Sequence, residues 1–445
     1  MNNAPLVAIG DIAEVFDGPH ATPRKTSNGP VYLGIDAISN DGHLIPGQFA
    51  HLSEDDYSKW TKRVVPQESD IVFSYEATLG RCAMIPRGFR GALGRRLALV
   101  RVNRNKVEPS WLYYYFLSPS WSAFIANQTF HGSTVDRVSV ENYPTYKIPL
   151  PPLEKQRAVA YVLSTIDDKI ANNKKLMAEL EETAQIIYDY WFTQFDFPDQ
   201  DGRPYRSSGG KMVWSPELKR EIPEGWAARK VIDLVSIEKG VSYTSEDLLG
   251  SGIPMISLAS FSSNGTYKPE AIKTYSGKID ARRTVEANDL IMCATQQTAI
   301  DLSGRTNVIG KAILTPSIFD ETTVISTDIV KLAPCDRKYA YVLEGLFKRR
   351  DIHRYIVGFA NGTKIKHLDV ASALSLFAAF PDVDDSTLHA FAEKRQQSMA
   401  AYSNLLRECD KLASLRDWLL PMLMNGQVRV DSFDVKDGAP PRCCV

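Results

Sequence analysis

The side chains best suited to bind a charged partner form two basic runs. Residues 77–107 contain eight lysines and arginines and no aspartate or glutamate, and Lys348-Arg349-Arg350 is followed by Arg354. Basic side chains that neutralise phosphates release counterions, so such runs are typical of contact with a nucleic-acid backbone. One run alone could be a solvated face. Two runs in two similar parts of the chain favour phosphate contact, although the net charge of −1 argues weakly against a free-standing DNA binder.

Sequence motifs for catalysis and metal binding are missing. The chain has no GxxxxGK(S/T) phosphate loop, no glycine fingerprint after a strand, and no GxSxG or HExxH. Its Pro-Pro pairs follow Leu150 and Ala439, so the (Asn/Asp)-Pro-Pro-(Tyr/Phe) loop typical of adenine methyltransferases is also missing. The six cysteines form no CxxC pair, which indicates a reducing compartment and no metal site. We therefore predict no catalytic residue, metal or cofactor in this chain.

The elements that position the basic and polar residues occur in two copies. Each copy begins with an apolar run that contains acidic residues, and a glycine then precedes a strand and a turn. Further along each copy, an acidic residue precedes a second apolar run, and another glycine follows that run. Such features in the same order predict a tandem duplication. The matched positions are residues 11–18 with 233–240, Gly29 with Gly252, Asp70 with Asp289, Gly80 with Gly310, and Pro151 with Pro381. Short β-like runs and turn residues dominate both copies, which indicates an α+β domain.

A long helical pattern follows each copy. Apolar residues there recur in steps of four and three, which is the heptad seam of a coiled coil. Asn173 and Arg395 interrupt the two seams, and one polar seam residue can fix register and partner number. The helices could pair antiparallel or each pack on its own domain. The seam and partner-interface residues are Leu163, Ile166, Ile170, Asn173, Met177, Leu180, Ile187 and Trp191, with Met399, Tyr402 and Leu406 in the second helix.

The expected architecture is α+β: two similar globular domains separated by two long antiparallel coiled-coil helices, with approximate two-fold symmetry. Pro, Gly, Ser and charged residues dominate the segment between the copies, which indicates a connector. The predicted segments are the first domain at 1–152, the first helix at 153–195, the connector at 196–226, the second domain at 227–382, the second helix at 383–425, and a tail at 426–445.

These segments resemble the specificity (S) subunit of type I restriction–modification enzymes, the HsdS-like proteins. Residues 148–156 (IPLPPLEKQ) run directly into the first long helix, as in that family. The connector from Phe197 to Trp226 and residues 415–426 (LRDWLLPMLMNG) look equally typical. The second copy departs from the pattern, because FPDVD at residues 380–384 replaces the Pro-Leu-Pro-Pro junction. The pattern therefore does not define where its helix begins.

The resemblance implies two target-recognition domains that bind a bipartite site in double-stranded DNA. It also implies two methyltransferase (M) subunits that methylate one adenine in each half-site, and motor-nuclease (R) subunits that can join for restriction. S-adenosylmethionine and ATP with Mg²⁺ would belong to those partners. The expected location is the cytoplasm of a bacterium or archaeon, since no apolar run is long enough to span a membrane.

Candidate DNA-binding residues follow from side-chain chemistry and position in the repeat, because recognition domains vary in sequence. Glutamine can pair bidentate with the N6/N7 edge of adenine, hydroxyls suit several base edges, and arginine or lysine can hold phosphates. An ordinary role in an exposed loop is the alternative for each. The candidates are Ser74, Tyr75, Thr78, Arg81, Arg95, Arg96, His131, Ser133, Thr134 and Arg137 in the first copy, and Thr295, Gln296, Gln297, Thr298, Lys311, Asn361, Thr363, Lys364 and Lys366 in the second.

Two other functions remain open from the sequence. A coiled-coil scaffold with protein-binding globular ends would also use the long helices, but it does not account for the basic runs. A duplicated hydrolase with an unrecognised pair of carboxylates would need a site that no motif indicates. We therefore expect a DNA-recognition subunit without chemistry of its own.

Overall fold

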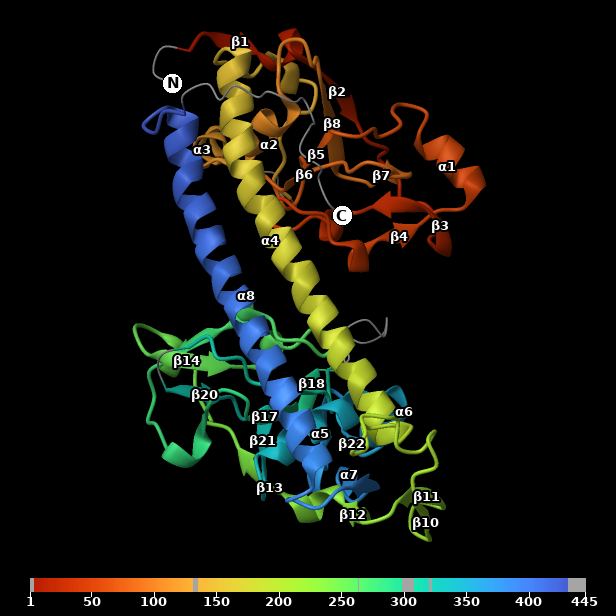
Figure 1. The fold of residues 1–445 in the computed structure, drawn as a ribbon. Helices are drawn as coiled ribbons and strands as arrows, with labels where there is room; N and C mark the ends of the chain where they lie inside the picture. Colours follow the sequence, from red (N-terminus) through yellow and green to blue (C-terminus); the bar gives the residue numbers. More distant parts are fainter. Residues whose placement is uncertain (1–3, 131–134, 263, 298–307, 320–321, 431–445) are drawn as a thin grey trace. The chain divides into compact units, whose positions relative to one another are not determined.

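The computed structural model describes residues 4–130, 135–262, 264–297, 308–319 and 322–430. The chain divides into two compact units: unit 1 comprises Met1–Asn172 and Cys409–Val445, and unit 2 comprises Asn173–Glu408. Each unit therefore contains part of both long helices, α4 (Leu153–Tyr188) and α8 (Ser386–Asn425) (Figure 1). None of the described helices combines the length and the apolar character that a membrane span needs.

A four-stranded antiparallel sheet of order β2-β8-β5-β6 forms the centre of unit 1. Alternate residues of β5 and β8 belong to two separate hydrophobic clusters, so both faces of the sheet are covered. Strands buried on both faces read as continuous apolar runs, as these do. The bounds are β2 (Ala13–Asp17), β5 (Ile71–Ser74), β6 (Cys82–Met84) and β8 (Leu97–Val102).

Unit 1 also has a three-stranded sheet of order β4-β3-β7 and an antiparallel pair, β1 with β9. Its main core joins the central sheet to the helices, and Trp111, Leu163 and Leu423 are buried there together. The bounds are β1 (Leu6–Ala8), β3 (Thr26–Leu33), β4 (Ala50–His51), β7 (Gly91–Leu93), β9 (Lys147–Pro149), α1 (Glu54–Trp60), α2 (Pro109–Leu117) and α3 (Pro119–Asn127).

Unit 2 has the same plan, with sheets of order β13-β21-β17-β19 and β15-β14-β20-β16, and the pair β12 with β24. A further antiparallel sheet has the order β18-β23-β22. The strands are β12 (Ala227–Lys230), β13 (Val235–Lys239), β14 (Ile253–Ile256), β15 (Lys273–Tyr275), β16 (Thr284–Val285), β17 (Leu290–Cys293), β18 (Thr295–Gln297), β19 (Ala312–Leu314), β20 (Thr323–Ile325), β21 (Ile329–Pro334), β22 (Ala360–Asn361), β23 (Ile365–Leu368) and β24 (Phe377–Phe380). The helices are α5 (Lys338–Lys348), α6 (Arg350–Val357) and α7 (Val370–Ala373).

The shared topology of the two units confirms the tandem duplication. The central sheet of each unit uses its strands in the same chain order, and two helices follow the last of them. Gly80 and Gly310 stand at the same point, before β6 and before β19, with φ of 82° and 76°. A Cβ at Gly310 would lie 2.6 Å from Cγ2 of Ile356, so both conformation and space favour glycine there.

Helices α4 and α8 pair antiparallel inside each unit. In unit 1 Asp167 pairs with Arg416, and in unit 2 Asn173 contacts Glu408 while Glu181 contacts Arg395. The alternative in which each helix packs only on its own domain is therefore wrong. Of the predicted seam, Leu180 and Ile187 are half-buried, and the following are buried: Leu163, Ile166, Ile170, Asn173, Met177, Trp191, Met399, Tyr402 and Leu406.

The connector is ordered and packs within unit 2. Phe197 stacks on Trp226 with ring centroids 5.2 Å apart, and the buried carboxylate of Asp196 accepts hydrogen bonds from the backbone N–H and the hydroxyl of Ser207. Its strands β10 (Met212–Ser215) and β11 (Arg220–Pro223) form a hairpin. The segment is therefore more than the loose connector that its composition suggests.

Candidate nucleic-acid interface

The basic run at residues 77–107 does not form one continuous free surface, and phosphate contact from it stays a prediction. Arg101 pairs with Asp70 at 2.6 Å, and other members are engaged in the same way. Arg87 and Arg95 are exposed and have no side-chain partner among the described residues. Six side chains hydrogen-bond or ion-pair within unit 1: Arg81, Arg90, Arg96, Arg101, Arg104 and Lys106.

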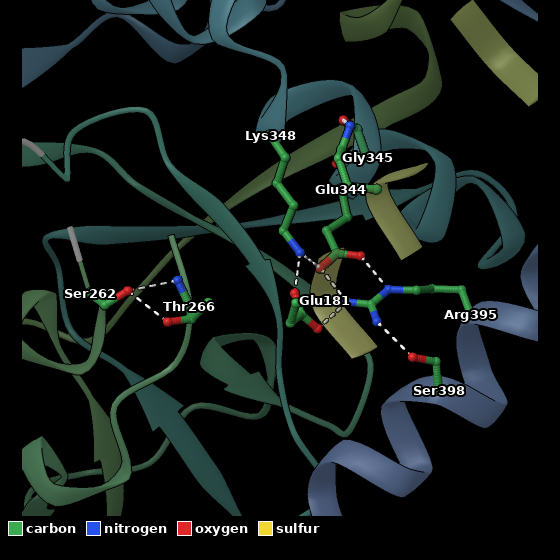
Figure 2. Close-up of polar contacts among 9 residues, drawn as sticks. Glu181, Ser262, Thr266, Glu344, Gly345, Lys348, Arg395 and Ser398 are labelled. Carbon is green, nitrogen blue, oxygen red and sulfur yellow. Dashed lines mark hydrogen bonds and ion pairs between the residues drawn. The ribbon is translucent and has the colours of Figure 1, made fainter. Parts of the chain in front are cut away.

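The second basic run is also largely engaged. Lys348 bonds Glu181 and Glu344 inside unit 2, as Figure 2 shows. Arg349 pairs with Asp351 at 2.6 Å and donates to the hydroxyl of Thr193 at 3.2 Å. Arg350 and Arg354 remain exposed, so phosphate contact from this run would depend on those two side chains.

Ser74 and Arg81 hold a loop of unit 1 in place. The buried hydroxyl of Ser74 donates to the carbonyl of Thr78 and accepts from the backbone N–H of Arg81 at 3.2 Å. The Arg81 guanidinium donates to the side-chain oxygen of Asn40 at 2.9 Å. As placed, neither side chain is offered to a base, whereas Thr78 is exposed.

The two polar loops predicted in unit 1 lie side by side, joined by a bridge between Glu76 and Arg137. Tyr75, one residue earlier, is buried, and burial raises the pKa of its phenol to about 12. Arg96 has the left-handed φ of 75° and lies 3.0 Å from the Glu76 carboxylate. Arg137 is exposed and pairs across a second bridge with Phe130, whose surface is 57% exposed. Glu76 and Phe130 were missed, because the sequence does not show this pairing.

The corresponding residues of unit 2 lie on β18, where burial gives them structural contacts. Thr295 donates to the carboxylate of Asp328 at 2.6 Å. The side-chain oxygen of Gln296 accepts from the backbone N–H groups of Val308 and Ile309 at 3.1 and 3.3 Å, and Gln296 is 4% exposed. The bidentate contact with adenine predicted for Gln296 would require the side chain to leave these contacts.

Strand β23 brings the second polar loop of unit 2 beside β18, with Gln296 opposite Lys366 and Thr295 opposite His367. Paired residues share one face of a sheet. His367 and its neighbour in β22, Asn361, are exposed, and so is Ile365, whereas Lys366 is half-buried. Leu368 and Val138 donate equivalent hydrogen bonds to Ala294 and Tyr75, so His367 corresponds to Arg137. His367 and Ile365 were missed by chemistry-based selection, although alternation along β23 could have indicated them.

Lys311 is half-buried and lines a cavity of unit 2. Burial lowers the pKa of its ammonium and also that of His353, which lies in the same cavity of about 480 Å³. Thr363 and Lys364 are exposed. Of the other predicted candidates, His131, Ser133, Thr134 and Thr298 lie outside the described residues, as does the side chain of Gln297. No cluster of three or more His, Cys, Asp or Glu side chains suited to a metal ion occurs in the described part.

Comparison with known proteins shows that the chain is similar to specificity subunits of type I restriction enzymes. Residues 3–182 match the family model for the type I restriction modification DNA specificity domain. Over 340 residues the chain is 23% identical to the MjaIX specificity subunit of Methanocaldococcus jannaschii, covering 75% of this chain and 72% of that one. The chain is HsdS-like.

Two further relatives extend the likeness over most of this HsdS-like chain. It is 18% identical over 450 residues to the HindI specificity subunit of Haemophilus influenzae, which covers 87% of this chain and 93% of that one. A solved structure of the type I S subunit from M. genitalium covers 95% of this chain and 97% of its own, with a TM-score of 0.51 and 14% identity. That likeness concerns the fold, and it agrees with the predicted α+β class and the two domains.

Proposed function

We propose that this HsdS-like chain is the sequence-specific DNA-binding subunit of a type I restriction–modification complex. It would recognise a bipartite site in double-stranded DNA and direct adenine methylation, and with a nuclease subunit restriction. The duplication is the observation that carries this proposal. Two domains of the same topology, each with exposed side chains at one equivalent place, suit a site made of two half-sites.

We propose further that the chain performs no catalysis and that two M subunits, and R subunits where present, supply it. S-adenosylmethionine, and ATP with Mg²⁺, would bind to those partners. Exposed apolar side chains on the long helices support partner binding, because such side chains gain most from being covered. They include Leu176 and Ile186 on α4 in unit 2, and Leu415 and Trp418 on α8 in unit 1.

Mapping the methylated adenines of a cell that expresses this chain with its M subunit tests the function. We expect one bipartite sequence with a fixed gap, which is lost when this chain is omitted. Purified chain should transfer no methyl group to DNA by itself, and it should shift labelled DNA better with M than without it. Methylation of the same sites without this chain would contradict the proposed function.

A further inference from the structure

A cleft of about 250 Å³ opens in unit 1 beside the first long helix, and we call it the α4 cleft. Its lining comes from the loop at residues 42–49, the end of β6, α2 and α4. All of these residues belong to unit 1, so the cleft lies within one compact body. Clefts that hold whole small-molecule ligands measure roughly 300–1,000 Å³, so this one suits a single side chain.

Most of the lining is apolar or aromatic. Phe49 and Met84 are half-buried, and each leaves part of its surface to the cleft. Tyr113 and Tyr114 also line it, and both hydroxyls already donate hydrogen bonds to other groups of unit 1. An occupant therefore meets mainly apolar and aromatic surface.

Helix α4 gives the cleft its polar side. Ser164, Asp168 and Ala171 line it, and their spacing of four and three residues places them along one face of the helix. The buried seam residues Leu163 and Ile170 follow a neighbouring stripe. The cleft therefore uses a different face of α4 from the one that pairs with α8.

The two carboxylates of the cleft differ in their partners. Asp167 accepts a hydrogen bond from the Tyr114 hydroxyl at 2.5 Å through one oxygen. Its other oxygen pairs with Arg416 at 3.0 Å. Asp168 has no side-chain partner among the described residues. The cleft therefore contains one carboxylate that the chain itself does not neutralise.

The surroundings of Asp168 disfavour its charge. Burial raises the pKa of its carboxyl, and the neighbouring charge of Asp167 raises it further. His43 also lines the cleft, but its Nε2 lies 3.9 Å from the carboxylate of Asp41. A half-buried carboxylate among apolar side chains is stabilised by a cation that comes from a bound partner.

The lining favours a guanidinium over other cations. A guanidinium is weakly hydrated, stacks on aromatic rings and offers a carboxylate two N–H groups. An ammonium holds its water more firmly, so its burial beside Phe49 and Tyr114 costs more. One unneutralised carboxylate also matches one positive charge, which an arginine side chain carries and a polyamine exceeds.

The surface around the cleft indicates that a protein supplies this arginine. Tyr161 lies two helical turns before Asp168 on the same face of α4, and its surface is 51% exposed. Pro46 lines the cleft and is also exposed. Exposed apolar side chains beside a charged cleft are what a protein partner would cover.

We propose that the α4 cleft binds one arginine side chain of the M subunit, with Asp168 as the partner of its guanidinium. The identity of the partner rests on the proposed function, whereas the chemistry of the occupant rests on the cleft alone. Arginine is one of the residues that most often anchor a protein interface by filling a pocket.

The corresponding position of unit 2 carries no charge. The buried seams align Leu163 with Ala392 and Ile170 with Met399, so Asp168 corresponds to Gln397. Gln397 is exposed, and its amide donates to Glu393 on the same helix. The arginine is therefore bound once per chain, by the first domain.

The methionine methyl signals of the full chain test the chemistry of the cleft without a partner. Met84 lines the cleft, and Met84→Leu assigns its signal. Nα-acetyl-arginine amide should shift this signal saturably, whereas its neutral isostere, Nα-acetyl-citrulline amide, should not. Asp168→Asn should abolish the response. No response to the arginine amide, an equal response to the citrulline amide, or a response that survives in Asp168→Asn would overturn the inference.

Thermal unfolding checks that the variant is folded. Asp168→Asn removes a half-buried charge, so its midpoint should equal or exceed that of the original chain. Glu154→Gln, exposed on the same helix, controls for loss of a carboxylate from α4. A midpoint lowered by Asp168→Asn alone would mean that the carboxylate already has a stabilising partner in the chain, which contradicts the proposed site.

Binding to the M subunit tests the source of the arginine. Asp168→Asn should weaken the affinity of the chain for M roughly tenfold, the loss expected for one charge-assisted contact, and Glu154→Gln should leave it unchanged. Replacing the arginines of M by glutamine, one at a time, should identify one whose effect Asp168→Asn does not increase. Unchanged affinity in Asp168→Asn, or losses that add for every arginine, would refute this docking. Failure of the original chain to bind M would instead contradict the proposed function.

Discussion

At the residue scale, the buried amide of Gln296 accepts two backbone hydrogen bonds, from Val308 and Ile309. Gln296→Ala removes the acceptor of both donors, of which the N–H of Ile309 is buried, and this should lower the free energy of unfolding by about 1–3 kcal/mol. Urea unfolding measures the loss, and Gln396→Ala at an exposed position of α8 is the control. Unchanged stability together with relaxed sequence preference at one half-site would instead make Gln296 a base reader.

Arg137 and His367 occupy equivalent exposed positions, one in each unit. If each contacts its own half-site, Arg137→Ala should change recognition of one half-site and His367→Ala that of the other. A lost base contact costs roughly 1–3 kcal/mol of discrimination, whereas a lost phosphate contact weakens binding to all sequences. Binding of the complex to a library of half-site variants distinguishes these outcomes. Arg87→Ala, at an exposed position outside both bridges, should leave both preferences intact.

The buried ionic cluster of Glu181, Glu344, Lys348 and Arg395 makes stability depend on pH with a definite sign. Burial opposes the charge of Glu344, but Arg395 and Lys348 outweigh it and lower the pKa of that carboxyl from 4.5 to about 2. Because the unfolded chain binds this proton more tightly, the stabilisation is fully present above about pH 4.5 and is lost as the pH falls towards 2. Arg395→Met should cost about 3–5 kcal/mol at pH 7.

The difference in unfolding free energy between Arg395→Met and the original chain should therefore shrink between pH 5 and pH 3. Urea unfolding across that range measures it. Lys394→Met, at the exposed neighbouring position, controls for loss of a cation from α8. A difference that stays constant with pH would mean that Arg395 acts through packing and not through the Glu344 carboxylate.

At the scale of elements, Asn173 is a polar residue in an otherwise apolar seam. It is fully buried, its amide nitrogen donates to Glu408 at 2.8 Å, and its amide oxygen has no partner among the described residues. A buried acceptor without a partner costs free energy, so Asn173→Leu should raise the urea midpoint, as replacement of seam polar residues does in coiled coils. Asn172→Leu, exposed one residue earlier, is the control. A lower midpoint would show that the bond to Glu408 contributes more than the burial costs.

The sequence predicts the elements of this fold better than it predicts the interface. Residues 153–192 contain neither glycine nor proline, and their apolar spacing is visible directly, so the long helix and its seam follow from the pattern. The sequence does not show whether the side chains of a basic run are free or paired. Arg90 pairs with Glu54 and Arg101 pairs with Asp70, and both partners lie more than 30 residues away in sequence. Thr295 and Gln296 are adjacent polar residues, and both are buried. An alternation of polar and apolar residues along a strand would place only one of them on a buried face, so the pattern does not predict this.

At the scale of the whole molecule, one chain builds two equivalent domains and keeps their helix contacts different. Between the helices of unit 1 lie one carboxylate, one guanidinium and a phenol, from Asp167, Arg416 and Tyr114. The helices of unit 2 instead share two carboxylates and two cations, from Glu181, Glu344, Lys348 and Arg395. The two domains therefore share a topology, while the polar contacts of their helices differ.

Exchange of one domain tests this modular arrangement. Replacing residues 1–150 by the first recognition domain of another specificity subunit should change one half of the methylated site and leave the other half and the gap unchanged. The incoming domain must supply a hydroxyl at the position of Tyr114. Asp167 and Arg416 lie outside the exchanged segment, and the Asp167 carboxylate accepts a hydrogen bond from that hydroxyl as well as from Arg416. A chimera with phenylalanine there should recognise the same new site but unfold at lower urea.

The reciprocal exchange of residues 227–382 must keep Glu344, Gly345 and Lys348, and it should change the other half-site. Sequencing of methylated DNA reads both outcomes, and a first-domain exchange that alters both half-sites would show that the two domains do not read DNA independently.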